Sequence, residues 1–119
     1  MRVLLVEDYR SNTRSHVGDD RTFIACAEDA DEAMSLLCHD TYDLVLLNMS
    51  ANPTDGFTLI SRLRAGGDST ALLALTGREI SDRVRAIELG ADDALAEPVD
   101  TAQVRARAAA PGSRAPGWS

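Results

Sequence analysis

Residues that could carry chemistry follow the apolar segments of this sequence, and Asn48 raises the sharpest question among them. Asn48 follows the apolar run at residues 44–47, where a buried strand would deliver it to a loop. A carboxylate at this place could attack phosphorus as a nucleophile, whereas an amide oxygen is far less nucleophilic. The sequence therefore has an unreactive polar side chain at a place where a reactive one could stand.

Other polar residues follow the first, fourth and fifth apolar runs of the chain. Glu7 and Asp8 follow the first run, Thr76 follows the fourth, and Glu97 follows the fifth. Any one of them could simply cap a strand. In parallel α/β sheets, however, ligands bind beyond the carboxyl ends of the strands. Polar residues at four such ends together predict a site at that edge of the sheet.

The elements that must position these residues are short apolar runs separated by helical patterns. The runs are residues 3–6, 22–27, 44–47, 71–75 and a weaker one at 94–96. Most of them are continuous rather than alternating, which is typical of strands covered on both faces. Five strand–helix units predict a parallel sheet with right-handed crossovers and helices on both faces.

Three of the five helical patterns have clear apolar faces, and a fourth has a cap signal. The faces are Ala30, Ala33, Met34 and Leu37; Phe57, Leu59, Ile60 and Leu63; and Ile80, Val84 and Ile87. Asp29 and Asp100 are predicted N-caps of the second and fifth helices, and Gly90 ends the fourth. Asp55 could turn the chain into the third helix and cap it. Residues 9–17 offer only a weak face, so the first helix should be short.

The composition limits the possible functions. The chain has 119 residues, 45% of them hydrophobic, and a net charge of −7. This fits one domain, and a negative charge disfavours direct binding to nucleic acid.

No run approaches the ~18 apolar residues that a membrane helix needs, so we expect a cytoplasmic protein without membrane contact. Cys26 and Cys38 are expected to be buried free thiols. Residues 111–119 should form a linker or tail.

Several segments together resemble the receiver domains of two-component response regulators. They are LLVED at residues 4–8, YDLVLLN at 42–48, LALTG at 73–77, GADDAL at 90–95 and EPV at 97–99. The resemblance covers residues 1 to about 110 and implies a flavodoxin-like, doubly wound α/β fold. Its five-stranded parallel sheet would have the strand order 2-1-3-4-5. The GADD stretch resembles the subfamily that carries a C-terminal winged-helix DNA-binding domain.

The resemblance also implies roles for individual residues. Glu7 and Asp8 match the acid pair that holds Mg²⁺ in receivers, and Thr76 matches the hydroxyl that contacts the phosphoryl group. Three positions depart from the family pattern. Asn48 stands where the family has its phosphoacceptor Asp, Glu97 where it has a Lys, and Ala94 where it has a switch aromatic residue.

These departures affect the acceptor, the counter-charge and the readout of one mechanism. An amide in place of a carboxylate removes charge from the Mg²⁺ ligands, so Mg²⁺ binding should be weak and no cofactor is required. Glu97 would repel a phosphoryl group. The favoured interpretation is an atypical receiver, not an enzyme, which acts as a phosphorylation-independent regulatory and interaction module of a transcription regulator. The alternative is a Mg²⁺-dependent phosphate-accepting switch that uses another residue, such as Asp55 or Thr76.

The resemblance further implies a homodimer through the face of the fourth helix, fifth strand and fifth helix. The charged residues of this face are Arg83, Arg85, Glu88, Asp92, Asp93, Arg105 and Arg107. We expect Asp92 or Asp93 of one copy to meet Arg107 of the other in a two-fold interface. DNA would be contacted only through a C-terminal domain outside these residues.

Overall fold

A parallel sheet positions the strand ends, as the apolar runs predict. The computed structural model describes residues 1–7, 21–96 and 100–108. The strands are β1 (Arg2–Val6), β2 (Phe23–Ala27), β3 (Leu44–Asn48), β4 (Leu72–Thr76) and β5 (Asp93–Ala96). Their order is β2-β1-β3-β4-β5, and every neighbouring pair is parallel. The predicted flavodoxin-like strand order is therefore confirmed.

Local capping signals set most of the helix ends. The helices are α2 (Ala30–His39), α3 (Pro53–Ala65), α4 (Ile80–Leu89) and α5 (Thr101–Ala108). Asp29 caps α2 by accepting the N–H of Glu32 at 2.8 Å, and Asp100 accepts the N–H of Ala102 at 2.8 Å before α5. Gly90 ends α4 with φ of 124°, a backbone conformation that favours glycine. These three predicted caps are confirmed.

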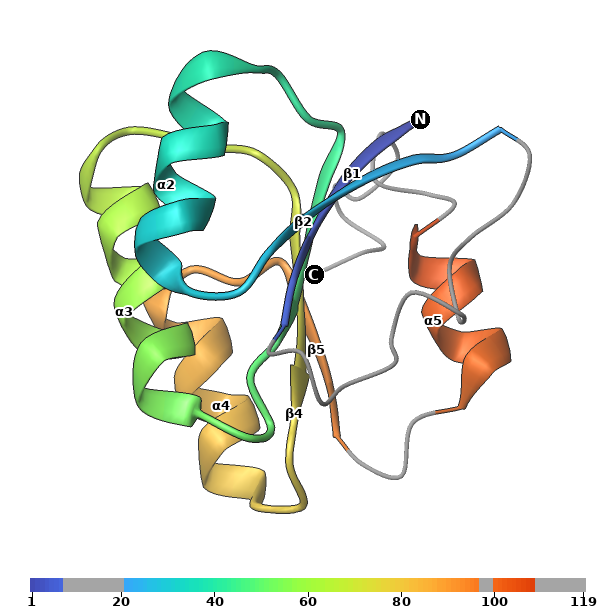
Figure 1. The fold of residues 1–119 in the computed structure, drawn as a ribbon. Helices are drawn as coiled ribbons and strands as arrows, with labels where there is room; N and C mark the ends of the chain where they lie inside the picture. Colours follow the sequence, from blue (N-terminus) through green and yellow to red (C-terminus); the bar gives the residue numbers. More distant parts are fainter. Residues whose placement is uncertain (8–20, 97–99, 109–119) are drawn as a thin grey trace.

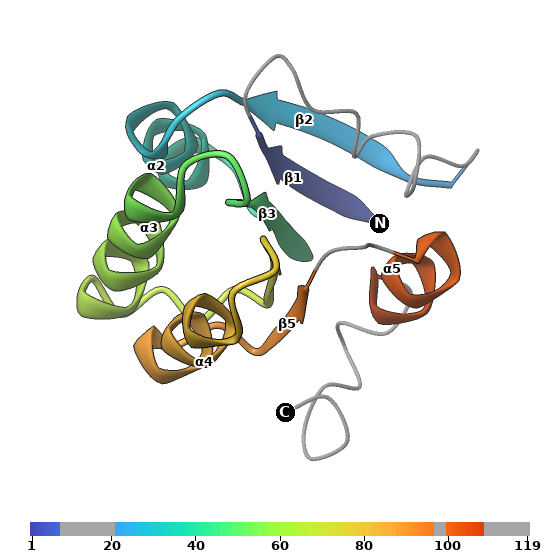
Figure 2. The ribbon, with the colours of Figure 1, turned by 90° about the horizontal axis from the view of Figure 1, so that it is seen from below.

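The helices cover the sheet from both sides. Helices α2, α3 and α4 lie on one face and α5 lies on the other (Figure 1, Figure 2). Alternate residues of β1 point into different cores: Leu4 and Val6 face α2–α4, while Val3 and Leu5 join the cluster that includes Val104 of α5. This division explains why the central strands are apolar without alternation.

The apolar stripe of α4 does not face the core, which corrects the expectation for the fourth helix. Ile80, Val84 and Ile87 are 73%, 50% and 46% exposed, whereas Ala86 is fully buried. The helix is fixed instead by its other faces, because Ala86 packs inward and Arg83 Nε donates to the carbonyl oxygen of Ala94 at 3.1 Å. The stripe is left on the surface.

The start of α3 also differs from the expectation. The helix begins at Pro53, and its cap is Asn52, whose side-chain oxygen accepts the N–H of Asp55 at 3.2 Å. Asp55 is therefore a residue of the first turn and not the cap. Asn followed by Pro at the first helical position is a local signal that could have identified this start.

The two thiols are exposed, so their expected burial was wrong. Cys26 lies on β2, the edge strand that pairs only with β1, and Cys38 lies in the last turn of α2.

The weak helical pattern at residues 9–17 lies outside the described residues. Among the helices of the described ranges, none combines the length and hydrophobicity that crossing a bilayer requires.

Candidate functional site at the carboxyl ends of β1 and β3

A small hollow of about 160 Å³ lies at the carboxyl ends of β1 and β3. We call it the β1–β3 hollow. Its lining consists of Val6, Glu7, Glu28, Asp29, Leu47, Asn48, Ala51, Asn52, Asp55 and Gly56. The sheet therefore brings Glu7 and Asn48 together, as expected. It adds Glu28, Asp29 and Asn52, which were not predicted because no local pattern distinguishes them from ordinary loop residues and helix caps.

Asn48 uses its side-chain oxygen within its own loop. Asn48 Oδ1 accepts the backbone N–H of Ser50 at 3.2 Å and the Ser50 hydroxyl at 2.9 Å. Asn and Asp commonly form such turns with the backbone two residues later. The half-buried amide thus shapes the loop between β3 and α3. Its side-chain oxygen is a weak nucleophile, and it also accepts two hydrogen bonds from Ser50.

Two carboxylates of the hollow are engaged at the N-terminus of α2. Asp29 caps the helix as described above, and Asp55 Oδ2 accepts the N–H of Ala30 at 3.1 Å. Asp55 therefore links the first turn of α3 to the start of α2. Negative charge at a helix N-terminus is favourable because the unpaired N–H groups carry partial positive charge.

The other predicted site residues lie elsewhere or outside the described ranges. Thr76 is 1% exposed, and its hydroxyl makes two long contacts with described residues, 3.4 Å to the Gly77 carbonyl and 3.5 Å to that of Leu95. Ala94 is fully buried on β5. Asp8 and Glu97 lie outside the described residues.

The hollow is rich in negative charge. Its lining contains four carboxylates and two amides and no basic side chain. Yet no group of three His, Cys, Asp or Glu side chains within the described ranges is arranged to hold a metal ion. Asn48, Asp29 and Asp55 already accept protein hydrogen bonds. The described lining therefore offers carboxylate and amide oxygens, and a phosphoryl group in the hollow would meet no described cation.

The acids expected at a dimer interface have partners within their own chain. Asp92 Oδ2 lies 3.2 Å from Arg64 Nη2 and accepts the N–H of Leu72 at 2.8 Å. Asp93 Oδ2 lies 2.6 Å from Nη1 of Arg107 of the same chain. The expected pairing of Asp92 or Asp93 with Arg107 of a second copy would have to replace these contacts.

Arg64 was not singled out by the sequence, but its guanidinium contacts four oxygen acceptors. Its guanidinium donates to the carbonyl oxygens of Gly90, Asp68 and Thr70 at 2.8–2.9 Å, besides pairing with Asp92. The cluster joins the end of α3 to the turn between α4 and β5. An arginine inside an amphipathic helix carries no local signal for contacts this distant in sequence.

Comparison with known proteins agrees with this geometry. The family model described as response regulator receiver domain matches residues 3–109. The response regulator MprA of Mycolicibacterium vanbaalenii is 32% identical over 111 residues, which are 90% of this chain and 48% of that protein. The transcriptional regulatory protein DltR of Streptococcus agalactiae is 31% identical over 111 residues, 90% of this chain and 50% of its own. The chain thus spans about half the length of these curated relatives.

Solved structures share the fold at lower identity. The receiver domain of Francisella response regulator 1452 superposes with a TM-score of 0.83 at 20% identity, covering 95% of this chain and 97% of that one. The receiver domain of a LuxO repressor protein from Vibrio parahaemolyticus gives a TM-score of 0.81 at 23% identity, covering 95% and 90%. At these identities the likeness concerns the fold.

Proposed function

Because this chain belongs to the family of response regulator receiver domains, we propose that it acts as a regulatory and interaction module without forming an aspartyl phosphate. The observation that carries the proposal is Asn48, the side chain at the end of β3. Its amide oxygen is held by the N–H and hydroxyl of Ser50. Amide chemistry and these contacts both disfavour attack on phosphorus.

Two further observations support a domain that does not switch through phosphate. The β1–β3 hollow presents carboxylates and no described cation to an incoming anion. Residue 94 is a buried Ala whose carbonyl oxygen accepts from Arg83 of α4. An Ala at residue 94 has no aromatic side chain that could rotate to report phosphorylation, and the Arg83 contact links α4 to β5.

Treatment with acetyl phosphate, followed by intact-mass measurement, tests the proposal. Wild-type protein should gain no phosphoryl group. The double variant Asn48→Asp, Glu97→Lys restores the residue types of the family and should gain one that hydroxylamine removes, because an acyl phosphate reacts with hydroxylamine. The variant therefore serves as the positive control for the donor and for the fold.

A hydroxylamine-sensitive adduct on the wild-type protein would contradict the proposal and support the alternative, a phosphate-accepting switch with another acceptor. Asp55 lines the same hollow as Asn48, so Asp55→Asn would then be the variant to compare. A stable adduct that Thr76→Val abolishes would instead identify the hydroxyl. Both outcomes would show that the domain still receives phosphate.

The module is proposed to serve a transcription regulator and to associate through the face of α4, β5 and α5. Relatives such as DltR carry that regulatory description and are about twice as long. The exposed stripe of Ile80, Val84 and Ile87 on α4 supports association, because covering exposed apolar side chains lowers the free energy of the system. The stripe, rather than the Asp–Arg pairs, would supply the affinity.

A further inference from the structure

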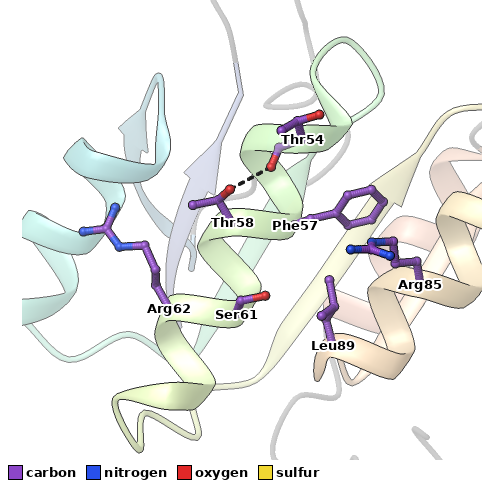
Figure 3. A pocket seen from close by; sticks show the side chains of 7 residues that line it. All are labelled: Thr54, Phe57, Thr58, Ser61, Arg62, Arg85 and Leu89. Atoms are coloured by element: carbon purple, nitrogen blue, oxygen red, sulfur yellow. Dashed lines mark hydrogen bonds between the residues drawn. The ribbon is translucent and has the colours of Figure 1, made fainter.

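A groove on the outer side of the molecule runs between α3 and α4, away from the β1–β3 hollow. We call it the α3–α4 groove; it has a volume of about 530 Å³. It is lined by Thr54, Phe57, Thr58, Ser61, Arg62, Arg85 and Leu89 (Figure 3). Residues 54, 57, 58 and 61 have the spacing of one helix face, so the groove follows α3 for about 10 Å.

The groove is positively charged on a negatively charged protein. It contains two guanidinium groups and three hydroxyls and no carboxylate, although the chain has a net charge of −7. Arg62 is neutralised in part by Asp31, whose carboxylate lies 2.8 Å away. Within the described part of the chain, Arg85 forms no ion pair. The unbalanced positive charge of the groove therefore lies at Arg85.

Arg85 is an exposed residue whose guanidinium lies over an aromatic ring. Its guanidinium carbon lies 5.2 Å from the centre of the Phe57 ring, and Figure 3 shows the side chain crossing from α4 toward that ring. A guanidinium over an aromatic ring can still donate hydrogen bonds from its N–H groups, and its planar fork suits a carboxylate. Phe57 and Leu89 add apolar surface beside it, and both are only partly buried.

We propose that the α3–α4 groove binds an acidic segment of a partner protein, with a carboxylate on Arg85 and an apolar side chain against Phe57 and Leu89. The groove is elongated and open along two helices, which suits a peptide segment better than a compact small molecule. It lies on the side of α4 opposite to the exposed stripe of Ile80 and Val84. The proposal is thus independent of phosphate acceptance and of dimerisation.

The test uses a capped, fluorescently labelled helical peptide with glutamate on one face and leucine on the other. Binding is measured by anisotropy and mapped by amide chemical shifts of the full chain. Arg85→Glu should weaken binding by about tenfold or more. Arg78→Glu is the matched control, because Arg78 is exposed, lies outside the groove and has the same charge change. It should change the affinity by less than about twofold.

Arg85→Gln provides a milder variant that removes the charge without reversing it, and it should also weaken binding. Thermal melts of all variants check that the fold is retained. Equal losses from Arg85→Glu and Arg78→Glu would overturn the proposal in favour of general charge attraction. Shifts centred on Val84 rather than Phe57 and Ser61 would also overturn it. The proposal would also be overturned if N-acetylglutamate, or a peptide with lysine in place of glutamate, bound as tightly as the glutamate–leucine peptide.

Discussion

At the scale of single residues, two arginine side chains with different surroundings should contribute differently to stability. Arg64 is 21% exposed and binds three carbonyl oxygens and one carboxylate, whereas Arg62 is 45% exposed and forms one pair with Asp31. Removing a partly buried charged donor leaves its acceptors without partners, while removing an exposed one lets water replace it. Substitutions of Arg64 and Arg62 therefore compare a partly buried arginine with an exposed one on the same helix.

Arg64→Ala should lower the free energy of unfolding by about 2–4 kcal/mol, because Asp92 and the carbonyl oxygens lose their common donor. Arg62→Ala should cost only ~0–1 kcal/mol, since its ion pair is exposed to water and salt. Urea unfolding of both variants under identical conditions measures the difference. Equal losses would mean that the Arg64 cluster contributes no more than a surface pair.

At the scale of the elements, the first turn of α3 packs closely against the residue that follows β3. A Cβ atom added at Gly56 would lie 2.5 Å from Met49 Cβ, just beyond the end of β3. Met49 is itself 1% exposed, so it has little room to move. Glycine at residue 56 thus allows the first turn of α3 to lie against the loop that also holds Asn48.

Gly56→Ala should destabilise the protein by about 1–3 kcal/mol, because the added methyl group overpacks this contact. Gly77→Ala is a suitable control, since its nearest neighbour would be the Ser50 carbonyl oxygen at 4.0 Å and its backbone does not require glycine. Thermal unfolding of the two variants compares them. If Gly56→Ala unfolds at as high a temperature as Gly77→Ala, then Met49 moves aside without a loss of stability.

At the scale of the whole molecule, the proposed association depends on what covers α4. The three apolar side chains of its outer stripe are exposed, while the nearby acids Asp92 and Asp93 pair with Arg64 and Arg107 of the same chain. Surface ion pairs contribute only ~0–1 kcal/mol each, and burying apolar side chains contributes about 1.5–3 kcal/mol each. Contact between two copies would therefore draw its free energy from the stripe.

Sedimentation at micromolar protein concentration should detect a dimer that Val84→Glu dissociates. Because Val84 is half exposed, the substitution should leave the unfolding temperature nearly unchanged. Phe23→Glu is the control, as Phe23 is 58% exposed on β2, outside the proposed face. A wild-type monomer at these concentrations, or equal dissociation by both variants, would contradict dimerisation through α4.

The sequence by itself determined the order of the elements, the strand order through its family resemblance, and the caps at Asp29, Gly90 and Asp100. It also placed Glu7 and Asn48 at one edge of the sheet. These features depend on residues a few positions apart or on the rule that parallel strands end at the same edge. Apart from the strand order, these features are recorded in residues close together in the sequence.

Only the tertiary structure decided which neighbour each surface meets. Periodicity placed Ile80, Val84 and Ile87 on one side of α4 but could not say that this side faces outward. The contacts of Arg64 with Gly90 and Asp92 join residues 26 and 28 positions apart. The pairing of Asp93 with Arg107 within one chain arises in the same way, because the fold brings α5 to the end of the sheet that holds β5. Side chains distant in the sequence come together through packing, which no local pattern records.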